Sequence, residues 1–204
     1  MSATVETTLP GEAAQPAGET KTISYRIDPS ASRFTVQAFA EGLFSAFGHN
    51  PRFNAEELSG EVRMEDGNLD SATLELLVKA GSLRVADDLS EKDRREIEHT
   101  MRDEVLETSR YSEIVFKGQA AKADRIYEGF YRVKITGQLS LHGTKGEHTI
   151  ETQVRLVEKG LRAEGETQLR QSDFGIKRVS VAAGTLKVKD EVKLSFNIVA
   201  NTAP

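Results

Sequence analysis

The chain has 204 residues, of which 38% are hydrophobic and 29% are charged, and its net charge is −5. This length and composition are typical of one globular domain that buries its own core. Charges of both signs alternate along the chain, which argues against the basic face of a nucleic-acid-binding protein. The absence of Cys excludes disulfides, thiolate metal sites and cysteine nucleophiles.

The N-terminal segment differs in composition from the rest of the chain. It is rich in Pro, Gly, Ala and Glu and has no aromatic residue, so it cannot bury enough apolar surface to offset the entropy of ordering. We predict a disordered tail over residues 1–21 and one domain over residues 22–201. The tail has neither the basic nor the apolar region of a secretory signal, and no later stretch has the ~18 apolar residues of a membrane span. We therefore expect a cytoplasmic protein.

Alternation of apolar and polar residues dominates from residue 22 to residue 200, and this period of two predicts strands that are buried on one side only. The predicted strands, with the apolar residues that share a face, are in chain order SRFTVQA (Phe34, Val36, Ala38), SATLELLVK (Leu74, Leu76, Val78), EIVFKG (Ile114, Phe116), YRVKITGQLSL (Tyr131, Val133, Ile135, Leu139, Leu141), HTIETQVRL (Ile150, Val154, Leu156) and EVKLSFNIV (Val192, Leu194, Phe196, Ile198). Turn-forming residues at 66–68, 143–146 and 158–160 separate strands.

Residues 90–106 break this pattern and predict a helix. Ile97, Met101 and Val105 recur at a spacing of four, and Ser90 is a plausible N-cap with acidic residues in the first turn. The apolar stripe is narrow, so we expect the helix to lie outside the barrel or across one of its mouths. The predicted fold is all-β: a single antiparallel, lipocalin-like β-barrel of about eight strands, capped or flanked by one helix.

The sequence contains no recognisable catalytic or metal-binding motif. His49, His99, His142 and His148 show no zinc-ligand spacing, and hydrolase and phosphate-binding motifs are absent. We interpret His142 and His148 as exposed or cap-forming residues beside the 143–146 turn, although the two could approach each other across a hairpin. We predict no cofactor, no metal and no catalytic residue.

The apolar interior is the remaining candidate for function. An eight-stranded barrel is wide enough to be filled by its own side chains or to hold one small ligand. Phe39, Leu43, Phe44 and Phe47 lie in an irregular segment, residues 38–48, that contains Gly42 and ends at Gly48. On physical grounds, this segment can form either a greasy entrance to the barrel or a plug of ordinary core.

Several segments in order resemble the YceI-like, polyisoprenoid-binding family of lipocalin-like bacterial proteins. They are YRIDPSASRFTV, LFSAFGHNPRF, EVLETSRYSEIVFKG, GQLSLHGTKGEHTI and RQSDFGI. Ser112 stands where the family usually has a proline. The resemblance implies a long isoprenoid or similar amphiphile inside the barrel. The lining positions that it implies are Phe34, Val36, Leu76, Val78, Ile114, Phe116, Val133, Ile135 and Phe174, with Phe44 and Phe47 near the mouth.

The first hypothesis is therefore a non-catalytic carrier of a polyisoprenoid, a quinone or another long-chain lipid. The second is an enzyme that uses the cavity, with His49 or His142 as the acid–base group. The third is a structural or stress-associated protein with a filled core. Arg170 and Asp173 could contact a polar head group, but an ion pair or a turn cap is the simpler interpretation, as is a permissive backbone for Gly175. The sequence leaves a homodimer possible.

Overall fold

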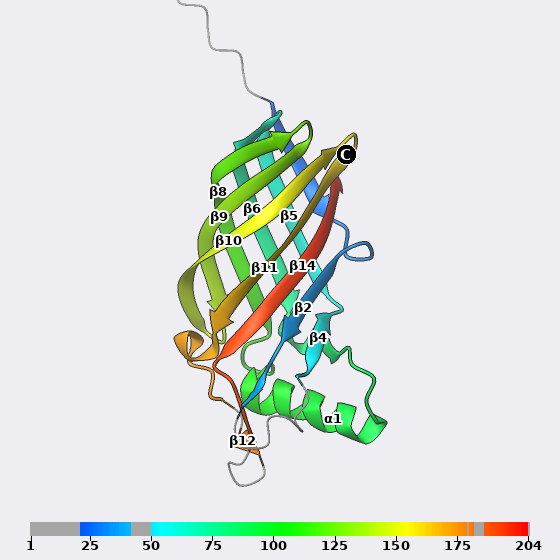
Figure 1. Cartoon of the computed structure of the whole chain (residues 1–204), viewed down its shortest axis with the longest axis vertical. Helices are drawn as coiled ribbons and strands as arrows, with labels where there is room; N and C mark the ends of the chain where they lie inside the picture. Colours follow the sequence, from blue (N-terminus) through cyan, green and yellow to red (C-terminus); the bar gives the residue numbers. More distant parts are fainter. Residues whose placement is uncertain (1–20, 42–49, 179, 182–185, 204) are drawn as a thin grey trace, which may run out of the picture.

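The computed structural model describes residues 21–41, 50–178, 180–181 and 186–203. Most of these residues form a closed antiparallel barrel of eight strands in the order β1-β5-β6-β8-β9-β10-β11-β14, with β14 pairing back to β1 (Figure 1). The strands are β1 (Thr22–Ile27), β5 (Leu58–Glu65), β6 (Asn68–Lys79), β8 (Glu113–Tyr127), β9 (Phe130–Leu141), β10 (Thr144–Val157), β11 (Gly160–Arg170) and β14 (Glu191–Thr202). The predicted all-β barrel with one helix is confirmed.

At one end of the barrel, at the top of Figure 1, short turns connect neighbouring strands, and we call it the turn end. The turns connect β5 to β6, β8 to β9 and β10 to β11, and two of them lie at the predicted positions 66–68 and 158–160. Gly67 and Gly129 both have a φ of 72°. Glycine suits these turns because it adopts a positive φ without a steric penalty.

The long strands β8 and β9 approach each other closely at Gly118 and Gly137, which are paired across the ladder. A Cβ atom at Gly137 would lie 2.2 Å from the carbonyl oxygen of Lys117 and 2.4 Å from the Cα atom of Gly118. No side chain fits in this space. Glycine in a strand interior often marks such a close backbone approach or a bend in a barrel wall.

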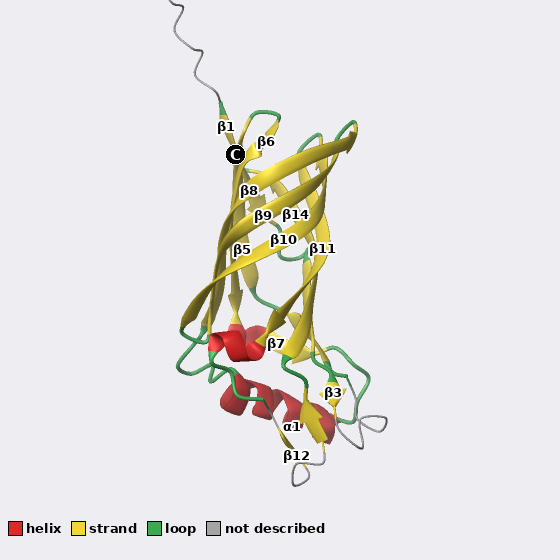
Figure 2. Cartoon of the chain, turned by 60° about the vertical axis from the view of Figure 1, so that its left-hand side comes forward, coloured by secondary structure: helices red, strands yellow, loops and turns green. Residues whose placement is uncertain are grey.

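The opposite end, which we call the helix end, has a different pairing pattern. Strand β14 pairs with β1 only through residues 200–202, and its residues 193–197 pair instead with β2 (Arg33–Gln37). Strand β2 pairs in turn with β4 (Arg52–Ala55), and β4 pairs with β7 (Leu83–Val85). A small separate sheet of β3 (Ala40–Glu41), β13 (Leu186–Val188) and β12 (Ser180–Val181) lies at the same end (Figure 2).

The helix lies across this end, below the barrel strands (Figure 2). Helix α1 (Glu91–Thr100) begins at the predicted cap, where the Ser90 side chain accepts a hydrogen bond from the Asp93 N–H at 3.1 Å. A π-helical turn, η3 (Met101–Val105), continues it. The apolar residues Ile97 and Met101 pack with Phe53 and Leu83, so the narrow stripe holds the helix against the β2–β4–β7 extension.

Two short 3-10 helices interrupt the wall at the same end, η2 (Ala80–Ser82) after β6 and η4 (Gln171–Phe174) after β11. Along the barrel strands, the inward faces carry the predicted apolar residues. On β9, for example, Val133 is 2% exposed while Arg132 and Lys134 are exposed. Towards the turn end some of these side chains form a packed cluster that includes Tyr25 and Met64, whereas towards the helix end they surround a hollow.

Candidate ligand-binding cavity

The barrel encloses a cavity of about 680 Å³ that extends to helix α1. This volume falls within the range of roughly 300–1,000 Å³ that is typical of small-molecule sites. Most of its lining is hydrocarbon and aromatic rings, contributed by inward-facing positions on nearly every barrel strand. The apolar residues in the middle of the barrel are Phe34, Val36, Leu74, Leu76, Val78, Ile114, Phe116, Ala120, Val133, Ile135, Leu139, Leu141, Ile150, Val154, Leu161, Ala163, Leu169, Val192, Leu194, Phe196 and Ile198.

The packed cluster at the turn end closes the cavity on that side. Met64 and Tyr25 belong to this cluster, and neither side chain reaches the cavity lining. At the helix end the lining becomes mixed, because Ile97, Met101 and Val105 lie beside the polar residues Asp93, Glu96 and Thr100. Lys187 of β13 completes this polar rim. A long apolar molecule in this cavity would therefore place its hydrocarbon inside the barrel, and the part of it at the helix end would be in contact with water.

The sequence profile of the YceI-like domain matches residues 25–200, which is most of the chain. The chain belongs to the YceI-like domain family. No protein with a curated description matches this YceI-like chain.

Solved structures share the fold of this YceI-like protein. Burkholderia cenocepacia BcnA is 14% identical with a TM-score of 0.65, covering 86% of this chain and 99% of its own. A polyisoprenoid binding domain from Saccharophagus degradans, implicated in plant cell wall breakdown, is 18% identical with a TM-score of 0.64, covering 89% and 99%. Campylobacter jejuni YceI protein is 16% identical with a TM-score of 0.56, covering 74% and 85%. At these identities the similarity shows the fold alone.

The YceI-like structure brings most of the residues implied by the resemblance to one surface. Those that line the cavity are Phe34, Val36, Leu76, Val78, Ile114, Phe116, Val133 and Ile135. Phe39, from the irregular aromatic segment, also lines it. Phe44, Phe47 and His49 lie outside the described residues.

Phe174 lies away from the cavity, contrary to its expected place. It belongs to η4, where the chain leaves strand β11 and the alternation of inward and outward side chains stops. Its ring packs over β10, so close that a Cβ atom at Gly146 would lie 3.3 Å from it, and it borders a separate hollow of about 200 Å³. Phe174 therefore contributes to the wall between β10 and η4.

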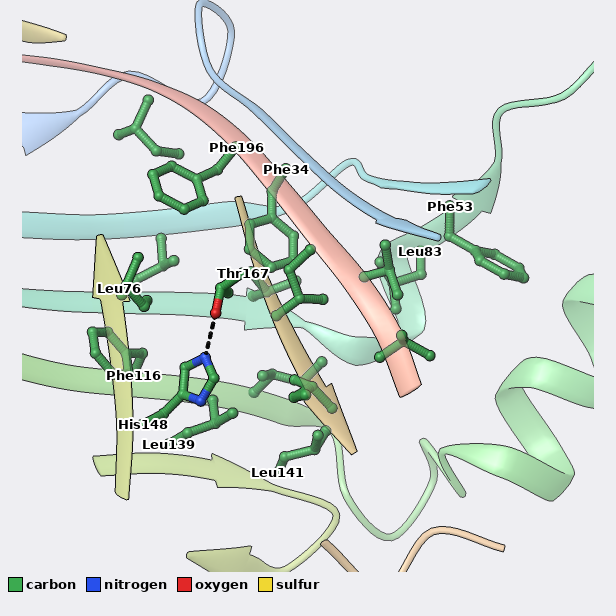
Figure 3. A pocket seen from close by; sticks show the side chains of 18 of the residues that line it. Phe34, Phe53, Leu76, Leu83, Phe116, Leu139, Leu141, His148, Thr167 and Phe196 are labelled. Atoms are coloured by element: carbon green, nitrogen blue, oxygen red, sulfur yellow. Dashed lines mark hydrogen bonds between the residues drawn. The ribbon is translucent and has the colours of Figure 1, made fainter. Parts of the chain in front are cut away.

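His148 lines the cavity, although the sequence interpretation placed it beside a turn as an exposed or cap-forming residue. It is the fifth residue of β10 and is half-buried, and its Nε2 atom lies 3.0 Å from the Thr167 hydroxyl oxygen on β11. Figure 3 shows the two side chains pointing towards each other among apolar residues, with Leu139 and Phe116 nearby. Burial lowers the pKa of His148, because desolvation disfavours the charged imidazolium.

A signal for His148 was present in the sequence. Ile150, Val154 and Leu156 were assigned to the inward face of this strand, and His148 shares their even spacing. Extending the alternation by one step towards the turn would have placed the His148 imidazole on the apolar face of the strand. A titratable side chain on an apolar face indicates function more often than one on a solvent-exposed face.

His142 is also not exposed, and its environment corrects the sequence interpretation. Its side chain is 11% exposed, and its ring lies 4.4 Å from the Tyr111 ring between centroids. The Nδ1 atom is 3.3 Å from the Phe174 carbonyl oxygen, whereas the buried Nε2 atom has no hydrogen-bond partner within the described part of the chain. His142 therefore holds together the β9–β10 turn, η4 and the segment before β8, and it does not face the cavity.

Arg170 has a structural partner, in line with the simpler interpretation of this residue, but the partner is Asp190. Their Nε and Oδ2 atoms are 3.1 Å apart, and Ser172 donates both its hydroxyl and its N–H to the same carboxylate. The Ser172 hydroxyl, then its N–H and the Arg170 guanidinium, lower the pKa of Asp190. Gly175 has a φ of 69° at the end of η4, which is the permissive backbone expected of it.

Two further features of the described residues bear on function. No group of three or more His, Asp and Glu side chains within those residues is arranged to hold a metal ion. No described helix combines the length and the apolar character needed to cross a bilayer.

Proposed function

We propose that this protein is a non-catalytic binding or carrier protein that holds a polyisoprenoid, a quinone-like molecule or another long-chain amphiphile inside its barrel. The observation that carries the proposal is the cavity of about 680 Å³, walled by hydrocarbon and aromatic side chains and closed at the turn end. Family membership and the fold shared with a polyisoprenoid binding domain support a lipid ligand.

The energetics of such a site favour a long apolar chain. Each CH₂ group that moves from water to an apolar surface contributes ~0.8 kcal/mol, so ten of them contribute roughly 8 kcal/mol before the cost of ordering the chain. Hydrocarbon alone can therefore give useful affinity. A protein of the filled-core type, the third hypothesis from the sequence, would leave no hollow of this size between its strands.

The enzyme hypothesis has weaker support. His142, one of its two candidate acid–base residues, is turned away from the cavity and lies under Tyr111. His148 does contact a hydroxyl, but its Nδ1 atom has no hydrogen-bond partner among the residues that the structure describes, so no carboxylate there orients the ring as a catalytic base requires.

Organic extraction of the purified full-length protein, followed by mass spectrometry, tests the proposal. We expect a long-chain lipid in about equimolar amount. Ala163 lines the cavity, so Ala163→Trp should block the chain and reduce the bound lipid strongly, whereas Arg162→Trp, on the outer face of the same strand, should not. A protein that carries no lipid from its host, and takes up no added isoprenoid after delipidation, would contradict the proposal.

A further inference from the structure

Among the described residues, one pair of polar side chains that bond to each other stands within the apolar wall of the cavity. His148 of β10 and Thr167 of β11 bond to each other across the gap between their strands (Figure 3). The other polar groups of the described inner wall have backbone partners: the Thr152 hydroxyl donates to the Glu164 carbonyl and the Gln171 amide donates to the Lys189 carbonyl. His148 and Thr167 therefore retain hydrogen-bonding capacity that the protein does not use.

The pair lies where the barrel wall opens. The β10–β11 ladder ends at the pair Thr152↔Gly165, and towards the helix end each strand continues without pairing to the other. The smaller hollow of about 200 Å³ lies in this region, with Glu147, Arg170 and Asp173 on its rim. We call this smaller hollow the slot. His148 lines both the slot and the large cavity, so it stands at the boundary between the apolar interior and a polar, water-facing opening.

The chemistry of the pair selects a class of polar group. A neutral imidazole has one donor and one acceptor nitrogen, and a threonine hydroxyl can both donate and accept. Whichever group donates in the His148–Thr167 bond, one nitrogen and one lone pair or proton remain for a ligand. The pair can thus donate to a carbonyl or accept from a hydroxyl.

A charged group would fit poorly at this position. The inner wall near His148 consists of apolar residues such as Leu139 and Ile150, and the lowered pKa of His148 keeps its ring neutral near pH 7. On the cavity side of His148, a phosphate or carboxylate would lose its water, and Arg170 on the rim of the smaller hollow is already paired with Asp190, so the lost hydration would not be offset. Beyond His148, Val154, Val133 and Ile198 continue the apolar wall to the turn end, where a hydrocarbon tail fits.

We propose that His148 and Thr167 form the polar-group subsite of the cavity, binding a neutral hydroxyl, carbonyl or amide of a ligand whose tail points to the turn end. This inference rests on the proposed function, because it assigns the ligand's polar group to a place within the same cavity.

The test is a competition assay with delipidated full-length protein at pH 7.5, in which each ligand displaces the fluorescent probe 1-N-phenylnaphthylamine. The ligands are geranylgeraniol, geranylgeranoic acid and the C20 hydrocarbon without the oxygen. One net hydrogen bond corresponds to an affinity gain of about 2- to 12-fold, so the alcohol should bind more tightly than the hydrocarbon by that factor. The acid should bind more weakly than the alcohol.

Two variants remove the subsite. His148→Leu and Thr167→Val should each abolish the preference for the alcohol while leaving hydrocarbon binding unchanged or tighter. His148→Gln, which still donates and accepts hydrogen bonds, should keep part of the preference. Thr149→Val is the matched control, because Thr149 lies on the outer face of β10 and contacts Thr136. Circular dichroism confirms that each variant is folded.

The outcomes separate the two proposals. If the wild type binds the ligands but both variants keep the alcohol preference, or if the acid binds most tightly, the subsite is wrong and the carrier function stands. If the wild type binds none of the three ligands, the proposed function fails and the subsite fails with it.

Discussion

The two ends of the barrel differ in how their strands pair and in how fully their interior is packed. At the turn end, β1, β14 and β5 pair directly, and Met64 is only 2% exposed. At the helix end, β14 pairs with β2, the β10–β11 ladder stops, and helix α1 lies across the opening. Continuous ladders and a filled interior stabilise the fold, whereas the interrupted wall leaves room for a ligand and a way in.

The backbone shows the same contrast. At the turn end, residues with positive φ in the turns are glycines, such as Gly67 and Gly129, whereas the described non-glycine residues with positive φ are Glu107 and His142, both at the helix end. Strained backbone of this kind persists only where its surroundings hold it, and it is often found near functional sites. At His142, the side chain is held by its contact with the Tyr111 ring.

Truncating one buried side chain at each end of the barrel should give the largest difference in the free energy of unfolding. Met64→Ala removes a buried side chain from the filled end and should lower the free energy of unfolding by about 2–5 kcal/mol. Leu194→Ala, at the wall of the cavity, should cost less stability because its side chain already borders a hollow, but it should weaken ligand binding. Urea unfolding of delipidated protein and probe competition measure the two effects; equal losses of stability would refute the contrast.

Adding a methyl group tests how tightly each end is packed. A Cβ atom at Gly160 would lie 2.2 Å from the Ala200 carbonyl oxygen, so Gly160→Ala must displace backbone and should cost roughly 3 kcal/mol. At Gly146, near the slot, the nearest atom is a Phe174 ring carbon at 3.3 Å, which can shift by a few tenths of an ångström. Gly146→Ala should therefore be much milder in thermal unfolding, and a larger cost for Gly146→Ala than for Gly160→Ala would contradict this view.

Glycine at position 107, where the backbone at the helix end is strained, should give a more stable protein than alanine at the same position. Glu107 has a φ of 45°, which costs a non-glycine residue about 1 kcal/mol. Glu107→Gly should therefore be more stable than Glu107→Ala by about that amount, since both variants lose the carboxylate near Arg110 and His142 and differ only in backbone freedom. Urea unfolding of the two variants measures the difference, and equal stabilities would show that the backbone there is unstrained.

The buried imidazole gives the helix end a pH dependence. The pKa of His148 is lower in the folded protein than its ordinary value of about 6.5, so below that pH the unfolded chain binds a proton that the folded chain does not. The free energy of unfolding should fall as the pH drops below about 6.5 and level off below the folded pKa. The charged residues that share the slot with His148 are Glu147, Arg170, Asp173 and Glu191.

Urea unfolding between pH 7.5 and 5 measures this effect. His148→Gln should remove the part of the slope that His148 contributes, while His99→Gln, at an exposed position on α1, should leave that part in place. An unchanged slope in His148→Gln would mean that burial does not lower the pKa of this residue. Carboxylates with lowered pKa values, such as Asp28 and Asp190, lose their contribution only at more acidic pH, so they do not overlap with this window.

Much of the wall of the cavity was predictable because strand alternation is a local property. Phe34, Leu76, Phe116 and Val133 each follow a period of two within their own segment, and the structure turns all of them inward. The prediction that Phe174 lines the cavity was wrong because the alternation of inward and outward side chains stops where β11 ends and η4 begins. No single residue in the sequence indicates that change. His148 was missed although its spacing indicated the inward face.

By itself, the sequence determined strands β2, β6, β8, β9, β10 and β14 with their apolar faces, the turns and the capped helix, because these depend on neighbours within a few residues. It did not single out the barrel strands β1, β5 and β11. Only the tertiary structure decided that β14 divides its pairing between β1 and β2, that β10 and β11 separate at Thr152, and that the ring of His142 packs against the ring of Tyr111. These features join residues far apart in the chain. They depend on how an eight-stranded sheet closes, which no local pattern of side chains specifies.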